Sequence, residues 1–252
     1  MKRTTKRLRW LRGYRLLFIF PVALMAILLS QPRWLFTFAA RLFPGALYAT
    51  QRDKASIKAI ALTIDDGPSP ATADILSVLN RYDAQATFFT ISSHIPGHES
   101  IVQQTVDSGH ELGNHLTADE PSIRLSTIDF EAALLTSEAI LLSYLPPNSQ
   151  LTWLRPGMGF YNDKMVEVAQ RHGYQVVLGS TFPYDTHIRS SRFAGEFILR
   201  TVQSGDIVVL HDGEERGIRT VETLEIILPE LQKRGYRVTT LSDLVVEKQQ
   251  SK

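Results

Sequence analysis

Two adjacent acids, Asp65 and Asp66, are the residues of this chain whose position most directly suggests chemistry. They follow the apolar run 59–62, which predicts a buried strand, and they precede Gly67 and Pro68, which turn the chain. Active sites of α/β folds are built where strands end. Adjacent carboxylates repel each other unless a cation or a proton lies between them, so one can bind a metal while the other acts as a base. The structural alternative is a surface turn that places acids before a helix.

Four more polar clusters follow predicted strands. His115 and Asp119 are four residues apart, which can place both on one face of a helical turn and suits a divalent metal. Arg155 lies beside a Gly-rich loop whose backbone N–H groups can face a developing oxyanion. Asp185 and His211 mark the other two clusters, and a histidine at a strand end suits general acid chemistry near neutral pH. Each residue alone also fits a structural role, but their joint position at strand ends favours one common site.

Strand-like and helix-like patterns alternate after residue 56. Repeated β–α units predict a parallel barrel or a doubly wound sheet, and about seven strands favour an α/β fold with a distorted (β/α) barrel. The predicted strands cover 57–64, 86–91, part of 109–115, 153–154, 175–178, 206–210 and 237–240, and the predicted helices cover 73–81, 100–108, 129–144 with Thr127 as its cap, 165–171, 193–203 and 221–233.

The N-terminal part differs from the rest in charge. Seven of the 27 Lys and Arg residues lie within the first 15 positions, which hold no acid. The remainder therefore carries 27 − 7 = 20 basic residues against 26 acidic ones, so outside the tail there is no basic surface for nucleic acid. The chain has no cysteine, which excludes disulfides, thiolate zinc sites and cysteine nucleophiles.

An unbroken apolar stretch, 16–29, follows the basic tail. Its length and basic flank resemble a signal anchor, and the poor cleavage site after it favours an uncleaved anchor over a cleaved signal peptide. The next apolar stretch can lie in the membrane interface or pack on the domain. We therefore expect a cytoplasmic tail at 1–15, a signal anchor or transmembrane helix at 16–30, an amphipathic lead-in at 31–52, and a catalytic domain at 53–246 outside the cytoplasm, in the periplasm or at the cell surface.

The chain resembles the polysaccharide deacetylase family, also called the NodB homology domain or carbohydrate esterase family 4, over roughly 57–245. Residues 63–68 read Thr-Ile-Asp-Asp-Gly-Pro and match the family's Thr-Phe-Asp-Asp-Gly-Pro. Residues 209–211 correspond to the family's Leu-x-His motif, with Val209 in place of the leucine. Residues 155–159 follow its Arg-Pro-Pro-Tyr-Gly pattern more loosely.

The resemblance implies a metal-dependent hydrolase that removes an N-acetyl or other N-acyl group from an amino sugar of a glycan. It implies that Asp66 and His115 bind a divalent ion, such as zinc, manganese or cobalt, and that Asp65 deprotonates the attacking water. The family's second ligand histidine is replaced here by Asp119, with Glu120 next to it. Either acid can complete the metal site, and an oxygen ligand shifts the preference towards harder ions such as manganese or magnesium.

The resemblance also assigns the proton donor and its supports. It implies that His211 protonates the leaving amine while Asp185 orients it, and that Arg155 holds Asp65. The backbone N–H near Met158 would complete the oxyanion site. Met158 also replaces the family's aromatic residue, a change that affects the substrate pocket more than the reaction.

Two other functions remain open at this point. The change at the metal site also fits a glycan-binding module without catalysis, and the fold also fits a deformylase or amidase acting on a lipid-linked or non-sugar amide. For the deacetylase, the candidate substrates are peptidoglycan, chitooligosaccharides, exopolysaccharides and lipid-linked amino sugars, and the N-terminal segment favours a substrate close to the membrane.

Overall fold

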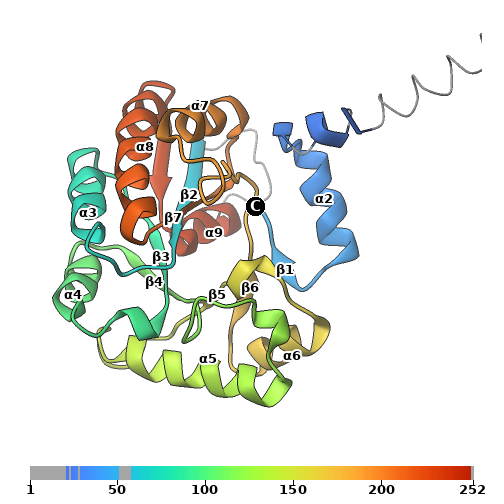
Figure 1. The fold of residues 1–252 in the computed structure, drawn as a ribbon, viewed down its shortest axis with the longest axis vertical. Helices are drawn as coiled ribbons and strands as arrows, with labels where there is room; N and C mark the ends of the chain where they lie inside the picture. The colour runs from blue at the N-terminus through green and yellow to red at the C-terminus, as the bar shows by residue number, and fades with distance from the viewer. Residues whose placement is uncertain (1–20, 23, 28, 51–57, 251–252) are drawn as a thin grey trace, which may run out of the picture.

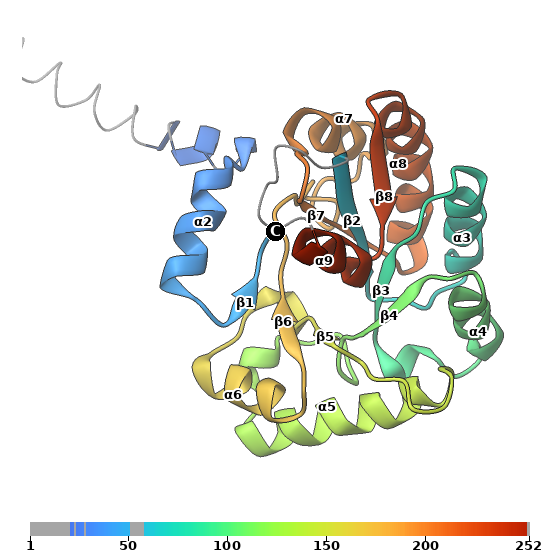
Figure 2. The ribbon, with the colours of Figure 1, turned by 180° about the vertical axis from the view of Figure 1, so that it is seen from behind.

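The computed structural model describes residues 21–22, 24–27, 29–50 and 58–250. One curled parallel sheet forms the centre, and helices cover its outer face (Figures 1 and 2). The strand order is β1-β6-β5-β4-β3-β2-β7, with β8 pairing to β2. The strands are β1 (Ala46–Leu47), β2 (Lys58–Asp65), β3 (Thr87–Thr90), β4 (Glu111–Asn114), β5 (Trp153–Leu154), β6 (Gln175–Val177), β7 (Ile207–His211) and β8 (Tyr236–Thr239).

The central strand β2 separates two cores. Its outward side chains, Ile60, Leu62 and Ile64, are buried in the large core beneath the helices. The alternate side chains, Ala59 and Ala61, belong to a second, smaller core inside the barrel. Successive side chains of a strand point to opposite faces, and a narrow barrel leaves room only for small residues at the inward positions of its central strand.

A C-terminal helix closes the amino end of the barrel. Leu241 and Leu244 of this helix, α9 (Leu241–Gln250), pack inside the barrel beside Phe89 and Trp153, and α9 contacts β2 (Figure 2). The carboxyl ends of the strands are therefore left to form the site. The helices are α2 (Arg33–Leu42), α3 (Thr72–Arg81), α4 (Glu99–Asp107), α5 (Thr127–Leu142), α6 (Asp163–Arg171), α7 (Ser191–Thr201), α8 (Glu214–Lys233) and α9 (Leu241–Gln250), with short 3₁₀ turns η1 (Ser92–His94), η2 (Ser122–Arg124) and η3 (Gly157–Gly159).

The structure confirms the predicted distorted barrel, whose seven strands after residue 56 are β2 to β8. The two-residue strand β1 was not predicted. The predicted cap of α5 was wrong by one residue, because Ser126 accepts the hydrogen bond from the Asp129 backbone N–H (3.2 Å) and Thr127 is already helical. α8 also begins at Glu214, well before the predicted start at 221.

The predicted tail, 1–15, lies outside the described residues, and the predicted anchor, 16–30, is described only in part. In the part of the chain that the structure covers, no helix is long and apolar enough to cross a membrane. The lead-in forms α2, which has no buried residue. Gln31 ties its start to the domain, donating to the Phe182 carbonyl oxygen (2.7 Å) and accepting from the Phe182 backbone N–H (2.8 Å).

Candidate active site

A cleft of about 590 Å³ opens at the carboxyl ends of the strands. Every side chain that the sequence analysis assigned to catalysis or metal binding lines it, although these residues come from five separate segments at the ends of strands or in the loops after them. Apolar residues, including Leu178, Phe182 and Val209, complete the wall. The predicted residues in the lining are Asp65, Asp66, His115, Asp119, Arg155, Asp185 and His211.

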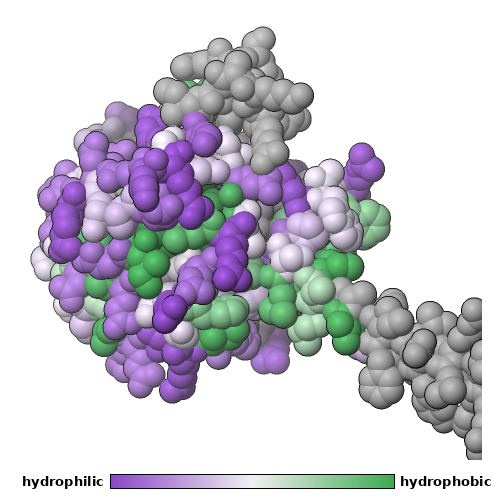
Figure 3. Space-filling view, turned by 90° about the horizontal axis from the view of Figure 1, so that it is seen from above, coloured by the Kyte–Doolittle hydropathy of each residue, from purple (hydrophilic) through white to green (hydrophobic). Residues whose placement is uncertain are grey.

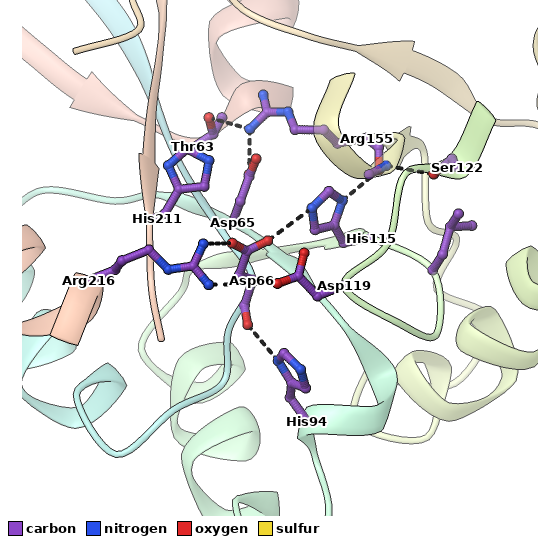
Figure 4. A network of polar contacts seen from close by, with 12 residues as sticks. Thr63, Asp65, Asp66, His94, His115, Asp119, Ser122, Arg155, His211 and Arg216 are labelled. Carbon is purple, nitrogen blue, oxygen red and sulfur yellow. Dashed lines mark hydrogen bonds and ion pairs between the residues drawn. The ribbon is translucent and has the colours of Figure 1, made fainter. Parts of the chain in front are cut away.

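Asp65 continues the inward row of β2 and is held by a buried arginine. Arg155 donates through Nη1 to Asp65 Oδ1 (2.6 Å) and to Thr63 Oγ1 (2.8 Å), and through Nε to the Val177 carbonyl oxygen (3.3 Å). Its guanidinium carbon lies 4.1 Å from the centre of the Phe89 ring. The arginine is thus fixed on several sides, and it fixes the orientation of the Asp65 carboxylate at the floor of the cleft (Figure 4).

Asp66 follows Asp65 directly in the chain but has different contact partners. Its backbone adopts a left-handed conformation (φ 69°), and its Oδ1 lies 3.3 Å from His115 Nε2. Burial alone would raise the pKa of Asp66. The hydrogen bond and charge of His115, together with the charges of His211 and Arg216, instead lower that pKa to about 2. Asp66 is therefore a carboxylate at any ordinary pH.

His115 is oriented as a metal-binding histidine would be. Its Nδ1–H donates to the Arg155 backbone carbonyl oxygen (2.6 Å), which directs Nε2 towards Asp66. Burial lowers the pKa of His115, but the hydrogen bond to Asp66 and the neighbouring carboxylates raise it overall. The donor chemistry of this pair, one carboxylate and one imidazole, fits two ligands of a divalent ion. Within the described residues, however, no group of three or more potential ligand side chains gathers.

Asp119 lies at the rim of the cleft, with 46% of its side chain exposed. The expected helical turn from His115 to Asp119 is not formed, and the segment is an irregular loop. Asn114 Oδ1 accepts from the Leu116 backbone N–H (2.8 Å), and Leu116 is left-handed (φ 64°), which ends any helical path. Asp119 lines the cleft, whereas its exposed neighbour Glu120 does not.

An arginine that the sequence analysis did not single out contacts both Asp66 and Asp119. Arg216, from the first turn of α8, places Nη1 2.8 Å from Asp66 Oδ2 and Nη2 3.8 Å from Asp119 Oδ2 (Figure 4). The apolar pattern predicts a helix that begins only at 221, which leaves Arg216 outside it. The glycine at 213 followed by Glu214 and Glu215, acids typical of a first helical turn, was the signal for the earlier start.

His211 and Asp185 form the other polar pair of the cleft. The Asp185 carboxylate accepts from the His211 backbone N–H (3.0 Å) and lies 3.0 Å from His211 Nδ1. Burial lowers the pKa of His211, but the hydrogen bond and charge of Asp185, with the charges of Asp65 and Asp66, raise it to about 9. His211 is therefore protonated at neutral pH.

Two further residues support the site from behind. His94 Nδ1 contacts the Asp66 backbone carbonyl oxygen at 2.8 Å. Asp212 is fully buried and accepts from Ser69 Oγ (2.6 Å), from Thr72 Oγ1 and from the Gly213 backbone N–H (2.6 Å). This carboxylate joins the loop after β2 to the start of α8, and neither residue was given a role from the sequence.

The loop that carries Asp119 is pressed against the loop that carries Arg155. A Cβ added at Gly157 would lie 2.1 Å from the Glu120 carbonyl oxygen, and the Gly157 backbone N–H donates to Ser122 Oγ (2.6 Å). We expect Gly157→Ala to lower the free energy of unfolding by about 1–3 kcal/mol, because a backbone atom must move. Thermal and urea unfolding measure it.

A matched control is Gly195→Ala on α7. Its Cβ would lie 2.8 Å from Ile226 Cγ2 and 3.1 Å from Ile226 Cβ, a contact with a side chain that is less severe than 2.1 Å to a backbone oxygen. Alanine is also the better helix former. Gly195→Ala should therefore lower the free energy of unfolding clearly less than Gly157→Ala. An equal decrease in both variants would contradict the tight contact between the two loops.

Comparisons with known proteins identify the relatives of this chain. The family model described as "Polysaccharide deacetylase" matches residues 52–177.

A peptidoglycan-N-acetylglucosamine deacetylase of Bacillus cereus is 35% identical over 201 residues, covering 79% of this chain and 93% of the relative. A chitooligosaccharide deacetylase of Bradyrhizobium is 28% identical over 213 residues, covering 79% and 97%. The solved peptidoglycan deacetylase PdaC of Bacillus subtilis superposes with a TM-score of 0.70 at 28% identity, covering 77% of this chain and 93% of that one.

The barrel and its cleft thus define an α/β protein with a site of paired acids and histidines at its strand ends. The chain belongs to the polysaccharide deacetylase family.

Proposed function

We propose that this protein is a hydrolase that removes the N-acetyl group from an amino sugar of a glycan. One observation carries the proposal: one cleft contains an acid held by a buried arginine, Asp65 with Arg155, and a protonated histidine held by an acid, His211 with Asp185. Amide hydrolysis needs a base for the water and an acid for the leaving amine, and these pairs supply both.

In this mechanism Asp65 takes a proton from the attacking water, and Arg155 keeps its carboxylate in position. His211 gives a proton to the leaving amine nitrogen, and Asp185 holds the imidazole in place. Asp66 and His115 would hold a divalent ion, with Asp119 as the proposed third ligand. When bound, the ion supplies a Lewis acid that polarises the acyl oxygen and acidifies the water. Of the residues in the cleft, Asp65 alone acts on the water, and the backbone N–H near Met158 is the proposed oxyanion donor.

Acetate release tests the function. Purified protein is incubated with peptidoglycan, chitooligosaccharides and a simple non-sugar N-acetyl amide, with zinc, manganese or cobalt supplied or with a chelator. We expect acetate from a glycan and a loss of activity with the chelator. Glycan binding without acetate release would favour a binding module, and release of acetate from the non-sugar amide alone would favour an amidase.

The high pKa of His211 predicts the pH dependence of the reaction. Catalysis needs protonated His211, so kcat/KM should fall as the pH rises through about 9. In Asp185→Asn the hydrogen bond and charge that raise this pKa are lost, so the fall should begin at lower pH. Acetate release measured from pH 6 to 10 gives both profiles. An alkaline limb at the same pH in both proteins would contradict the role of Asp185.

We also propose that α2 lies at a membrane surface, with the catalytic domain outside the cytoplasm. Trp34, Phe38 and Leu42 recur every fourth residue and are 58%, 55% and 58% exposed. In Figure 3, hydrophobic residues lie on the surface at the α2 side of the molecule. Such an apolar stripe, preceded by an apolar stretch and a basic tail, suits the interface of a bilayer.

The absence of cysteine makes this prediction simple to test. Phe38→Cys carries an environment-sensitive dye in the full chain, reconstituted with phosphatidylglycerol-containing vesicles. The control is Ile128→Cys on α5, because the native Ile128 is 79% exposed. We expect a blue shift and quenching by lipid-borne quenchers only at position 38. An aqueous spectrum at both positions would refute the interfacial placement.

A further inference from the structure

We propose that Arg216 competes with the divalent cation for Asp66 and so sets how readily this protein takes up metal. The inference rests on the proposed function, since it concerns the ion that Asp66 and His115 would hold. A guanidinium beside a metal-binding carboxylate lowers the affinity for the metal by charge repulsion and by occupying the oxygen that the metal needs.

The contacts of Asp66 are divided between two partners. Its Oδ1 faces His115 Nε2 (3.3 Å) and its Oδ2 faces Arg216 Nη1 (2.8 Å), so both carboxylate oxygens already have a contact. The carboxylate is 7% exposed and the arginine side chain is 33% exposed. Arg216 can therefore swing out into solvent, whereas Asp66 is buried at the cleft, and it is the arginine that must move when an ion arrives.

The same guanidinium also engages the proposed third ligand. Arg216 Nη2 lies 3.8 Å from Asp119 Oδ2, and Figure 4 shows the guanidinium reaching towards both carboxylates. With Arg216 in place, the two acids share an organic cation instead of a metal. Displacement of Arg216 from Asp66 would therefore also make Asp119 available as a ligand.

The position of Arg216 in α8 is not one that helix stability would select. It lies in the first turn, where a positive charge is unfavourable next to the positive end of the helix dipole. The turn itself is fixed, because a Cβ at Gly217 would lie 2.5 Å from both Asp212 Oδ1 and Ala71 Cβ. The backbone of Arg216 is therefore held close to the cleft, and only its side chain is free to swing.

Calorimetric titration with Mn²⁺ and with Zn²⁺ tests the proposal on the full chain. We expect Arg216→Gln to bind these ions at least tenfold more tightly than the wild type. Arg216→Lys, which keeps the charge but loses the planar fork, should lie between them. Arg189→Gln is the control. The Arg189 side chain is 77% exposed, lies 3.6 Å from Glu215 of α8, and does not line the cleft. Its replacement should therefore change the metal affinity by less than twofold.

A double-variant cycle links the effect to Asp119. Asp119→Asn should weaken metal binding severalfold in Arg216→Gln and less in the wild type, where the lost ligand is partly offset by the lost contact between Asp119 and Arg216 in the metal-free protein. The shift in melting temperature on adding Mn²⁺ gives a second readout and reports folding. Equal or weaker metal binding by Arg216→Gln, with a folded protein, would overturn the proposal.

The outcome is separable from the proposed function. Acetate release at saturating metal reports the function, whereas the ratio of metal affinities reports Arg216. A protein that releases no acetate but still shows the tenfold ratio would refute the function alone. Active protein with the same metal affinity in both forms would refute the competition alone.

Discussion

Asp65→Asn should reduce acetate release by about 10²- to 10⁴-fold, the size of a general-base contribution. Asparagine keeps the shape of the side chain and can still accept from Arg155, but it cannot take a proton from water. The variant should bind glycan as well as the wild type, so the loss should appear in kcat. Initial rates at several glycan concentrations measure this separation.

The matched control is Asp74→Asn, which removes an exposed acid of α3 outside the cleft. Its activity should stay within about twofold of the wild type, because surface changes of this kind have small effects. Undiminished activity in Asp65→Asn would refute the assignment of Asp65 as the base.

Arg155→Met should be the most destabilising change at the site, at about 3–5 kcal/mol, because it leaves the buried Asp65 charge without its partner. The wild-type contact is 2.6 Å, between side chains that are only 4% and 5% exposed. Activity should be lost as well, since Asp65 would no longer be oriented. Urea unfolding followed by circular dichroism gives the stability.

The paired variant Arg155→Met with Asp65→Asn distinguishes the charge from simple loss of packing. Removing both charges should be less destabilising than Arg155→Met alone, because no unpaired carboxylate remains. The alternative is that the double variant is less stable than Arg155→Met by the full decrease in unfolding free energy that Asp65→Asn causes alone. In that case the pair contributes packing and hydrogen bonds, and its charges are not coupled.

The parts of the fold that hydrophobic patterns encode were predictable. β2, β3 and β7 are continuous apolar or β-branched runs, and parallel strands place their carboxyl ends along one edge, so acids and histidines directly after them had to converge. Asp65, Asp66 and His211 are therefore predicted to lie together from the sequence alone. This prediction depends only on strand direction and not on side-chain detail.

Other parts depend on contacts that no local pattern encodes. The start of α8 contains Gly217, and a glycine in a sequence favours the end of a helix over its interior. In the structure a glycine is needed there because Ala71 and Asp212 approach the backbone too closely for a side chain. With that turn missed, Arg216 was missed too. The four-residue spacing of His115 and Asp119 predicts a helical turn, whereas the side chain of Asn114 turns the chain another way. The closing helix α9 was also not predicted.

The link between Gln31 and Phe182 has a consequence for the reach of the enzyme. Phe182 is part of the cleft wall, and the two hydrogen bonds from Gln31 tie that wall to the residues that lead into α2. If α2 lies on a bilayer, the cleft is held at a fixed height and angle above the lipid, instead of swinging on a long tether. The enzyme would then work on a thin layer of glycan next to its own membrane, and the thickness of that layer would be set by the domain itself.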